Sequence, residues 1–315
     1  MPIQVFIDGE AGTTGLQIRE RLSGRADIRL IRLDDGHRKD DAARAEALND
    51  ADVAILCLPD DAARSAVSLI RNDRTRVIDA STAHRTAPGW VYGFPELGPG
   101  RRRAVQEALR VSNPGCYPTG FLALVRPLVA AGLIPPDWPC TVNAVSGYTG
   151  GGKAMIAEFE DEGSPTFSRA AFRIYATALG HKHITEMQVH AGLAHAPLFA
   201  PAVGRFAQGM IVEVPFQLSA LPSRPTLEAV REVLQRSYTG ERFVEVADAA
   251  EVEVTKTLDP EGLNGTNRLK LFAFGDAERG QARLVALLDN LGKGASGAAV
   301  QSLNLMFGLD EATGL

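Results

Sequence analysis

The chain begins with Met1-Pro-Ile3-Gln-Val-Phe-Ile7-Asp8-Gly9-Glu-Ala-Gly12-Thr-Thr-Gly15. The apolar run from Ile3 to Ile7 predicts a strand, and a helical pattern follows from Thr14 to Leu22. Between them the glycines have the spacing G-x-x-G-x-x-G, a variant of the G-x-G-x-x-G fingerprint of dinucleotide-binding turns. Glycines let such a turn approach a pyrophosphate closely, and the N–H groups of the following helix stabilise its charge. The residues expected to hold the pyrophosphate are Gly9, Gly12, Thr13, Thr14 and Gly15.

Strand-like and helical segments alternate through the first third of the chain. After the opening unit, residues 28–33, 53–58 and 77–80 have strand patterns, and residues 42–48 and 62–70 have helical patterns. This alternation is typical of a parallel, doubly wound sheet. Because the run 53–58 is apolar throughout, we expect both faces of the sheet to be covered. The sequence therefore predicts an α/β fold whose first domain is a Rossmann-type dinucleotide domain.

The pattern changes at residue 141. Strand-like segments follow at 141–145, 211–216, 243–246 and 268–274, and some of them alternate polar and apolar residues. Such strands suit an α+β domain with a mixed or antiparallel sheet. Helices are expected at 227–238 and 296–307. We expect residues 1–115 with 298–315 to form the dinucleotide-binding domain and residues 116–297 to form the catalytic, substrate-binding and oligomerisation domain. The return of the last helix to the first domain does not follow from periodicity.

Composition limits the possible partners. The 315 residues are 45% hydrophobic and 23% charged, as in a globular protein with a buried core. With a net charge of −5, the chain has no signature of nucleic-acid binding, and we expect the short basic run 101–103 to be a solvated loop. No apolar stretch is long enough to span a membrane, and no signal-peptide pattern precedes the first strand. Three cysteines cannot all pair, so a reduced, cytoplasmic setting is expected, with no nucleic-acid or membrane partner.

The stretch Ser112-Asn-Pro-Gly-Cys116-Tyr-Pro-Thr119 is the first candidate site. Pro114 and Gly115 predict a turn, so Cys116 falls at or just before the start of a helix. A helix N-terminus favours an anion and can lower the pKa of a thiol from about 8.5 by a unit or more. The alternative is a buried turn cysteine without chemistry. Cys57 and Cys140 lie within or beside expected strands and are interpreted as structural, which leaves Cys116 as the candidate nucleophile.

Thiol chemistry on a carbonyl needs a proton donor or acceptor, and three of the six histidines cluster at 181–190. The sequence Gly180-His-Lys-His-Ile-Thr-Glu186 suits an active-site turn before a helix, although a polar surface turn is the alternative. Residues 79–85 follow a strand end, where doubly wound sheets bind ligands, and an arginine there can bind phosphate. The loop 146–153 is rich in glycine and ends in lysine. It resembles an anion-binding nest but lacks the Walker spacing, and a flexible connection is the alternative.

The end of the second expected strand bears on the choice of cofactor. Arg32 could contact the 2′-phosphate of NADP, whereas Asp34 could bind the 2′-hydroxyl of NAD. We expect NADP, with Arg32 as the contact, and the sequence leaves NAD open. No metal site is expected.

Taken with these residues, the chain resembles the N-acetyl-γ-glutamyl-phosphate reductase family of arginine biosynthesis, in its shorter type. The resemblance spans nearly the whole length and is most specific at 112–119, 145–153 and 180–186. In the longer type, Arg stands in place of Lys182 and Pro in place of Thr185. The family is similar in architecture to aspartate-semialdehyde dehydrogenase. The resemblance implies NADPH-dependent reduction of N-acetylglutamyl 5-phosphate to the 5-semialdehyde and phosphate through a cysteine thioester, in a homo-oligomer (dimer or tetramer).

The resemblance also assigns roles to residues. Cys116 is the nucleophile and His183 the acid/base, with His181 the less favoured candidate. The substrate-binding residues that it implies are Arg85, Asn113, Ser146, Gly147, His181 and Glu186, with Arg85 and Asn113 holding the substrate phosphate. Beyond the glycine turn, the cofactor contacts are Arg32, Ser81, Thr82 and Asn304, the last within the segment 293–304. No residue is identified as the reader of the acetamido group.

Three other functions compete with this interpretation. The nearest is another acyl-phosphate reductase, similar to aspartate-semialdehyde dehydrogenase. A thiol acyltransferase or hydrolase would use Cys116 without a redox step. A redox sensor would bind NADP and undergo modification of Cys116 without forming an aldehyde. The glycine turn, the histidine turn and the Gly-Lys loop together argue against the last two.

Overall fold

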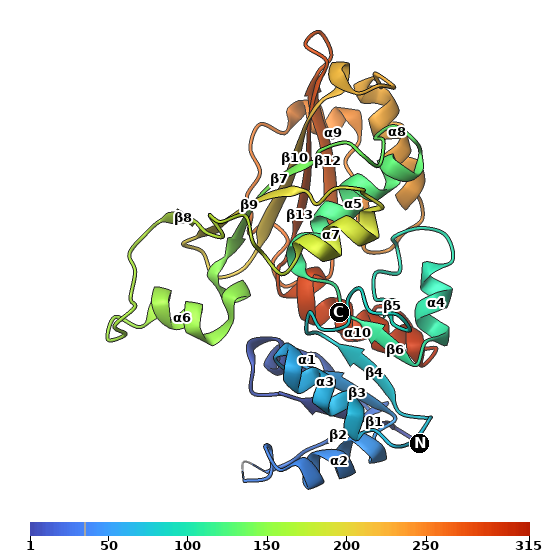
Figure 1. The fold of residues 1–315 in the computed structure, drawn as a ribbon, viewed down its shortest axis with the longest axis vertical. Coiled ribbons are helices and arrows are strands. Elements are labelled where there is room, and N and C mark those ends of the chain that lie inside the picture. The colour runs from blue at the N-terminus through green and yellow to red at the C-terminus, as the bar shows by residue number, and fades with distance from the viewer. Residues whose placement is uncertain (35) are drawn as a thin grey trace. The chain divides into compact units, whose positions relative to one another are not determined.

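The computed structural model describes residues 1–34 and 36–315 and divides them into two compact units. Unit 1 comprises Met1–Pro95, Gly100–Gly115 and Ala295–Leu315, and unit 2 comprises Glu96–Pro99 and Cys116–Gly294. Each unit is built on a sheet of its own (Figure 1). The chain therefore passes from one unit to the other several times, and one of these steps falls directly before Cys116.

Unit 1 contains a six-stranded sheet with the strand order β2-β1-β3-β4-β6-β5. Its strands are β1 (Ile3–Asp8), β2 (Ile28–Ile31), β3 (Val53–Leu56), β4 (Arg76–Asp79), β5 (Val91–Tyr92) and β6 (Arg110–Ser112). All five neighbouring pairs are parallel, with Val5 opposite Val53 and Ile55 opposite Ile78. The predicted parallel, doubly wound sheet is confirmed.

Helices cover both faces of this sheet. They are α1 (Thr13–Leu22), α2 (Asp41–Asp50), α3 (Asp60–Leu69), α4 (Arg101–Glu107) and α10 (Gly297–Met306). One hydrophobic cluster joins the strands to residues of α1, α4 and α10, and a second joins them to residues of α2 and α3. All four residues of β3 are fully buried, which explains why that strand is apolar throughout.

The expected solvated loop at 101–103 is wrong, because these arginines form the first turn of α4. Gly100 precedes the helix in the left-handed region, at φ 77°. Carboxylates offset the repulsion among the guanidinium groups. Arg103 donates to Glu107 over 2.8 Å, and Arg102 pairs with Glu311 at 3.2 Å. The i,i+4 spacing of Arg103 and Glu107 is one that supports a helix.

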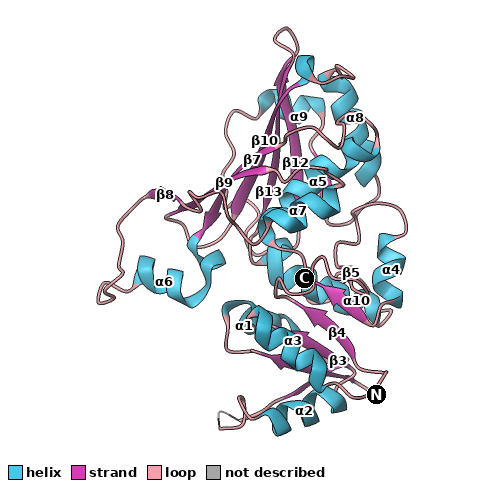
Figure 2. Cartoon of the chain, viewed as in Figure 1, coloured by secondary structure: helices cyan, strands magenta, loops and turns pink. Residues whose placement is uncertain are grey.

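Unit 2 contains a seven-stranded mixed sheet with the order β11-β12-β13-β10-β7-β9-β8 (Figure 2). Its strands are β7 (Thr141–Gly147), β8 (Phe172–Ile174), β9 (Leu198–Gly204), β10 (Met210–Gln217), β11 (Val244–Val246), β12 (Leu269–Asp276) and β13 (Gln281–Leu288). Strands β7 and β9 are parallel, as are β11 and β12, and the other neighbours are antiparallel. The predicted mixed sheet is confirmed.

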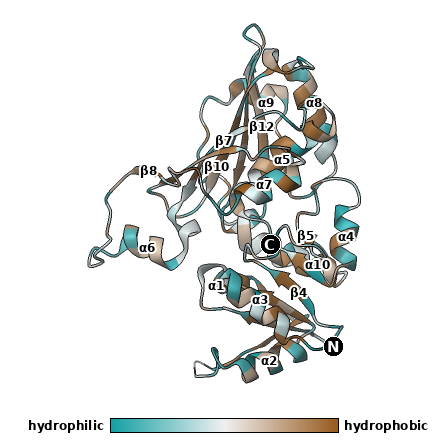
Figure 3. Cartoon of the chain, viewed as in Figure 1, coloured by the Kyte–Doolittle hydropathy of each residue, from teal (hydrophilic) through white to brown (hydrophobic). Residues whose placement is uncertain are grey.

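The helices of unit 2 are α5 (Cys116–Ala130), α6 (Gly152–Glu160), α7 (Ile184–Ala191), α8 (Leu227–Tyr238) and α9 (Ala249–Val254). Short turns of other helical types occur at η1 (Tyr148–Gly151), η2 (Leu218–Ala220) and the π-helical η3 (Gly292–Ser296). Helix α5 is apolar around most of its surface and is buried from Tyr117 to Val125 (Figure 3). It packs on β10 and β13, so the core of unit 2 fixes the position of the residue that begins it.

Gly120 allows this close packing of α5 on the sheet. A Cβ atom built at Gly120 would lie 2.7 Å from Val212 Cγ2 and 3.3 Å from Ala286 Cβ. We therefore expect Gly120→Ala to lower the free energy of unfolding by about 1–3 kcal/mol, because overpacking forces the helix from the sheet. Denaturant unfolding measures the change. Gly180→Ala, where no atom lies within 4 Å of the added Cβ, is the control; equal stabilities of the two variants would contradict the expectation.

Candidate active site

Cys116 is the first residue of α5, as the Pro-Gly turn before it predicts. Asn113, Pro114 and Gly115 are buried, whereas Cys116 itself is partly exposed. The other two cysteines have environments that disfavour a thiolate. Burial raises the pKa of Cys57 to about 12, with further contributions from the negative charges of Asp79 and Asp8, and burial raises the pKa of Cys140 to about 12. Its position at a helix N-terminus thus sets Cys116 apart from Cys57, which is also partly exposed, and from Cys140, which is buried.

The histidine turn lies beside the start of α5. The ring of Tyr117 is 6.0 Å from the imidazole of His181 and 5.8 Å from that of His183, measured between centroids. The two imidazoles are 4.7 Å apart in an edge-to-face arrangement. Phe199 on β9 completes the cluster, at 5.0 Å from Tyr117 and 5.1 Å from His181. The structure therefore brings the residue next to Cys116 together with both predicted histidines.

Two tyrosine hydroxyls extend this cluster. Tyr175 donates to the hydroxyl of Tyr117 over 2.9 Å, and Tyr117 donates to the carbonyl of Ala202 over 3.4 Å. Burial raises the pKa of Tyr175 to about 12, and the negative charge of Cys116 adds to this effect. The pKa of Tyr117 is also raised by burial, with the charges of Tyr175 and Cys116 adding. Both phenols are therefore protonated at neutral pH and lie within electrostatic range of the Cys116 sulfur. The sequence pattern does not identify either tyrosine as a site residue.

The histidines differ in burial and in hydrogen bonding. His183 is 6% exposed and is the N-cap residue of α7, and Glu186 in the first turn is 2% exposed. His181 is partly exposed, and its Nδ1 accepts the backbone N–H of His183 at 3.1 Å. Because a backbone N–H can only donate, Nδ1 of His181 carries a lone pair and its proton resides on Nε2 when the ring is neutral. The predicted helix after the histidine turn is confirmed.

Ser146 and Gly147 end β7 and are both buried. The Ser146 hydroxyl donates to the carbonyl of Gly147 over 3.1 Å and lies close to the Tyr117 phenol. A Cβ at Gly147 would lie 2.5 Å from the carbonyl oxygen of Ala207, so this position requires glycine. Lys153, in the first turn of α6, is exposed. The loop thus places one polar side chain, Ser146, beside Tyr117.

In unit 1, the glycine turn joins β1 to α1. Gly9 has φ 89°, and a Cβ there would lie 2.3 Å from the carbonyl oxygen of Cys57. A Cβ at Gly15 would lie 2.6 Å from the carbonyl oxygen of Gly9. Gly12 is the N-cap of α1, whose first turn contains Thr13 and Thr14 and no acidic residue. The turn is therefore as close-packed as a pyrophosphate site requires, at an uncompensated helix N-terminus.

A cavity of about 540 Å³ adjoins this turn. It is lined by Phe6, Ile7, Asp8, Gly9, Glu10, Ala11, Ile31, Arg32, Leu33, Gly36, Arg38, Lys39, Arg44, Leu58 and Ala62. Arg32 is exposed at its rim, with Arg38 and Lys39 close by in sequence. Arg44 is committed to a buried ion pair with Asp8 at 2.8 Å. The sequence pattern predicts Arg32 as a cofactor contact but not Arg38 or Lys39, which line the same cavity.

Asp34 is engaged within its own loop. Its Oδ1 accepts the backbone N–H groups of Gly36 and His37 at 3.0 and 3.1 Å, and both of its carboxylate oxygens lie within 2.9 Å of the His37 ring nitrogen Nδ1. Hydrogen bonding by His37 lowers the pKa of this carboxyl. Asp34 does not line the cavity. These contacts weaken the alternative in which Asp34 binds a ribose 2′-hydroxyl.

Strand β4 ends in a buried acid, Asp79, which has three hydrogen-bonding groups of the following segment around it. Asp79 is fully buried and accepts hydrogen bonds from the backbone N–H of Ser81 at 2.9 Å and from its hydroxyl at 2.8 Å. The Nδ1 of His84 lies 2.6 Å from the same carboxylate, and its ring stacks on Trp90. Thr82 hydrogen-bonds Asp60 through its backbone N–H and its hydroxyl. The segment is therefore held rigidly at the carboxyl end of β4.

Arg85 and Asn113 belong to one network in unit 1. Arg85 is 8% exposed and donates to the carbonyls of Asn113 at 3.0 Å and Ala80 at 3.2 Å. Asn113 is 2% exposed, and its Nδ2 donates to the carbonyl of Ala295 at 2.9 Å. Its Oδ1 is buried without a hydrogen-bond partner among residues 1–34 and 36–315. Because buried polar atoms are usually hydrogen-bonded, we expect this oxygen to accept a hydrogen bond from a bound molecule.

Asn304 is fully buried on α10. Its Nδ2 donates to the carbonyls of Glu311 and Thr313, and its Oδ1 accepts from Arg25 at 2.9 Å. These contacts fasten the last residues of the chain to α10, which favours a structural role for this side chain.

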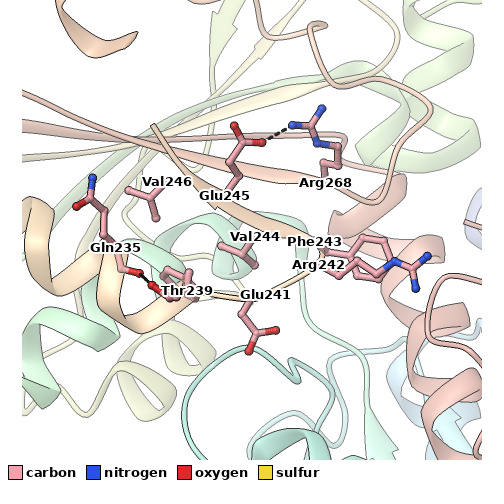
Figure 4. Close-up of a pocket in the computed structure, with 10 residues that line it drawn as sticks. Gln235, Thr239, Glu241, Arg242, Phe243, Val244, Glu245, Val246 and Arg268 are labelled. Carbon is pink, nitrogen blue, oxygen red and sulfur yellow. Dashed lines mark hydrogen bonds and ion pairs between the residues drawn. The ribbon is translucent and has the colours of Figure 1, made fainter. Parts of the chain in front are cut away.

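A second cavity, of about 430 Å³, lies in unit 2 (Figure 4). The C-terminal end of α8 and strand β11 form its walls, and the ion pair of Glu245 and Arg268 lies on one side. None of the predicted site residues lines it.

In the described part of the chain, no cluster of three or more His, Cys, Asp or Glu residues could hold a metal ion. None of the described helices combines the length and apolar character needed to cross a membrane.

Two family sequence profiles match the chain. Residues 116–290 match the semialdehyde dehydrogenase dimerisation domain, and residues 32–105 match the semialdehyde dehydrogenase NAD binding domain. The first match begins at Cys116, where unit 2 resumes after the Pro-Gly turn. A dimerisation domain indicates that the chain forms oligomers, and an NAD binding domain indicates a dinucleotide cofactor.

Curated relatives match nearly the full length. The chain is 55% identical over 313 residues to the N-acetyl-gamma-glutamyl-phosphate reductase of Burkholderia ambifaria, covering 99% of the chain and 98% of the relative. It is 54% identical to the protein of that name from Brucella ovis, covering 98% and 100%. Among solved structures, aspartate semialdehyde dehydrogenase II from Vibrio cholerae, complexed with ASA, has a TM-score of 0.69 at 15% identity, with 98% of both chains covered. A probable aspartate-semialdehyde dehydrogenase from Pseudomonas aeruginosa has a TM-score of 0.70 at 18% identity, covering 98% of this chain and 99% of its own. At these identities the structures show a shared fold.

Proposed function

Because the chain belongs to the semialdehyde dehydrogenase family, as a relative of the N-acetyl-γ-glutamyl-phosphate reductases, we propose that it reduces N-acetylglutamyl 5-phosphate to N-acetylglutamate 5-semialdehyde and phosphate. One observation carries the proposal: a partly exposed cysteine begins α5 next to a cluster of two imidazoles. This arrangement supplies a nucleophile and a proton donor, which are the groups that covalent acyl transfer requires.

The first step is acylation of Cys116. The thiolate, which the N-terminus of α5 stabilises, attacks the acyl carbon of the substrate and forms a C–S bond. The C–O bond to phosphate then breaks, and phosphate leaves with the bonding electron pair. The product is a thioester of Cys116. Forming a covalent intermediate divides one difficult reduction into two easier steps.

The second step is reduction of the thioester. NADPH held at the glycine turn would supply the hydride for the acyl carbon. His183 donates a proton to the oxyanion that forms, which gives the thiohemiacetal, and takes the proton back when the C–S bond breaks. The aldehyde then leaves, and Cys116 returns to the thiolate. The ring contact of His183 with Tyr117, the neighbour of Cys116, supports this role. His181, Glu186, Ser146 and Gly147 are proposed to shape the substrate site around it.

Arg85 and Asn113 are proposed to have different ligands. A guanidinium suits the leaving phosphate, and the bonds of Arg85 to two main-chain carbonyls would hold it in place. Asn113 presents a buried amide oxygen, which accepts hydrogen bonds and would repel a phosphate dianion. An amide N–H of the substrate or of the nicotinamide carboxamide suits it better, because either group supplies a donor. We therefore assign the phosphate to Arg85 and an amide N–H to Asn113.

The cofactor is proposed to be NADP(H). Gly9, Gly12 and Gly15 form a turn that a side chain would fill, with Thr13 and Thr14 at the helix N-terminus beyond. Arg32, Arg38 and Lys39 line the adjoining cavity, which suits a 2′-phosphate, while Asp34 is engaged in its own loop. Ser81 and Thr82, at the carboxyl end of β4, are proposed to lie on the nicotinamide side. Asn304 is proposed to act indirectly, by supporting α10.

This assignment predicts a change in cofactor preference. Hydrogen bonds to a charged group contribute about 1.5–3 kcal/mol, so Arg32→Ala/Lys39→Ala should raise KM for NADPH on the order of 10–100-fold. NADH carries no 2′-phosphate, so its kcat/KM should change little. Steady-state kinetics with the two cofactors measure the ratio. Arg29→Ala, an exposed position on β2 that does not line the cavity, is the matched control. An unchanged preference in the double variant would remove these side chains from the cofactor site.

We further propose that residues 1–115 with 298–315 act as the dinucleotide-binding domain and residues 116–297 as the catalytic and oligomerisation domain. The semialdehyde dehydrogenase dimerisation domain that matches residues 116–290 supports a homo-oligomer, a dimer or a tetramer.

Three cysteines, of which Cys57 and Cys140 have raised pKa values, suit a reducing compartment, so a cytoplasmic location is proposed.

A substrate panel tests the proposed function. The reverse reaction, with phosphate and NADP⁺, can be followed by the absorbance of NADPH. We expect turnover of N-acetylglutamate 5-semialdehyde and at most weak turnover of aspartate semialdehyde. Omitting phosphate should stop turnover, because phosphate is needed to release the acyl group from Cys116. Turnover of aspartate semialdehyde with none of the acetylated aldehyde would instead favour an aspartate-semialdehyde dehydrogenase.

A further inference from the structure

The residues of unit 2 at which the chain crosses between the two units lie close to one another. The chain enters unit 2 briefly at Glu96–Pro99, enters again at Cys116 and leaves after Gly294. Glu96, Cys116 and Gly294 are therefore the residues of unit 2 at these three places. A group that holds all three together would determine the position of the proposed nucleophile.

A buried ion pair joins two of these places. The Nζ atom of Lys293 lies 2.7 Å from Oε1 of Glu96, and the two side chains are 1% and 0% exposed. The ammonium group also lies 5.5 Å from the centroid of the Phe243 ring, a residue that Figure 4 shows beside Arg242 on the wall of the second cavity. Neither member of the pair has a place in the proposed chemistry.

The third place is packed directly against the second. A Cβ built at Gly294 would lie 2.8 Å from Cβ and 3.3 Å from Cα of Cys116, so the backbone next to Lys293 touches the nucleophile. The N–H of Gly294 donates to the carbonyl of Asp289 at 3.0 Å. From the other side, Arg126 of α5 donates to the carbonyl of Leu97 at 3.0 Å. Both segments are thus fastened to α5, η3 at the first residue of the helix and Glu96–Pro99 further along it.

Stability alone does not account for this pair. Removing two charges from water carries a large desolvation cost, and replacing a buried pair by apolar side chains of similar volume is often neutral or stabilising. An apolar contact tolerates small displacements, however, whereas a buried ammonium and carboxylate stabilise one another only within hydrogen-bonding distance. Such a pair is therefore suited to specifying the alignment of Glu96 with η3.

We propose that Glu96 and Lys293 are positioning residues, whose ion pair holds the backbone at Gly294 against Cys116 and so fixes the thiol in its reactive position. The proposal rests on the proposed function of Cys116 as the nucleophile. The pair does not touch the reacting atoms; it acts through the backbone of η3.

The double variant Glu96→Gln/Lys293→Met tests this role, because it removes both charges and leaves neither unpaired. Three properties are measured: the unfolding temperature, the rate of Cys116 alkylation by iodoacetamide, and the steady-state kinetics, with kcat expressed per titrated thiol. A displacement of about 1 Å can cost 10²-fold in rate, so we expect kcat and the alkylation rate to fall by 10–100-fold. KM for NADP should not change. Glu213→Gln/Arg283→Met, which removes a more exposed pair of unit 2, should leave all three quantities unchanged.

Two results would overturn the proposal. One is a double variant with the kcat and alkylation rate of the unchanged protein. The other is a lower unfolding temperature with an unchanged kcat per titrated thiol, which would show that the pair has only a structural role. If the double variant does not fold, Lys293→Arg carries the test, because it retains both charges but alters their alignment. It should then lower kcat, and an unchanged kcat would refute the proposal. If the unchanged protein reduces no acyl phosphate, the proposed function fails, and the alkylation rate still tests the pair.

Discussion

Replacing Cys116 by serine should abolish phosphate-dependent reduction of NADP⁺ by N-acetylglutamate 5-semialdehyde. A serine hydroxyl stays protonated at neutral pH and is a much weaker nucleophile than a thiolate, so it cannot form the acyl intermediate at a useful rate. Loss of a nucleophile in covalent enzymes costs on the order of 10⁴–10⁶ in kcat. Because Cys116 begins α5 and is partly exposed, the smaller oxygen atom should leave the fold and NADP binding intact. Spectrophotometric rates and cofactor titration measure the two properties.

The other cysteines are matched controls. Cys57→Ser and Cys140→Ser remove thiols whose pKa burial raises to about 12, so neither is a thiolate at neutral pH. Each variant should retain kcat per folded molecule, although placing a hydroxyl in an apolar site is expected to reduce stability. Full turnover by Cys116→Ser, or loss of chemistry in one of the controls with its fold intact, would assign the nucleophile to another residue.

His183→Asn should lower kcat by about 10²–10⁴, the range expected when a general acid–base group is lost. Asparagine fills a similar space at the N-cap of α7 but cannot gain and lose a proton near neutral pH. KM for the semialdehyde should change less than kcat, because the acid–base role acts in the transition state. Steady-state kinetics over a range of substrate concentrations separate the two parameters.

His181→Asn gives the contrasting result. The side-chain oxygen of asparagine can replace Nδ1 as the acceptor of the His183 backbone N–H, so the turn should persist. We expect chiefly a higher KM, since His181 is assigned to the substrate site. His195→Asn, at an exposed position in the same unit, should leave both parameters unchanged. A large loss of kcat in His181→Asn with little change in His183→Asn would exchange the two roles.

Local patterns identified the parts of the fold that short segments determine. The Pro-Gly turn placed Cys116 at a helix start, the glycine turn preceded α1, and the apolar stripe at 227–238 matched α8. These features depend on backbone restriction and periodicity within a few residues, which sequence displays directly.

Other features depend on contacts between distant residues and escaped the sequence analysis. Strand β13 is paired on both sides in the centre of its sheet, and its mostly apolar run has no distinctive period. The start of α4 looked like a basic loop because the acid that pairs with Arg102 is at position 311. Lys293 belongs to the segment 293–304, in which Asn304 is expected to contact the cofactor, whereas its partner Glu96 lies almost 200 residues away in sequence. Such pairs become visible only in the folded chain.

Mass spectrometry of the acylated protein tests the central claim most directly. The protein is mixed with N-acetylglutamate 5-semialdehyde and NADP⁺ without phosphate, so that oxidation can occur but phosphorolysis cannot. The account predicts one N-acetylglutamyl group per chain, bound to the peptide that contains Cys116, sensitive to hydroxylamine and discharged by added phosphate. NADPH formation without any acyl group on Cys116, or an acyl group on another residue, would contradict it.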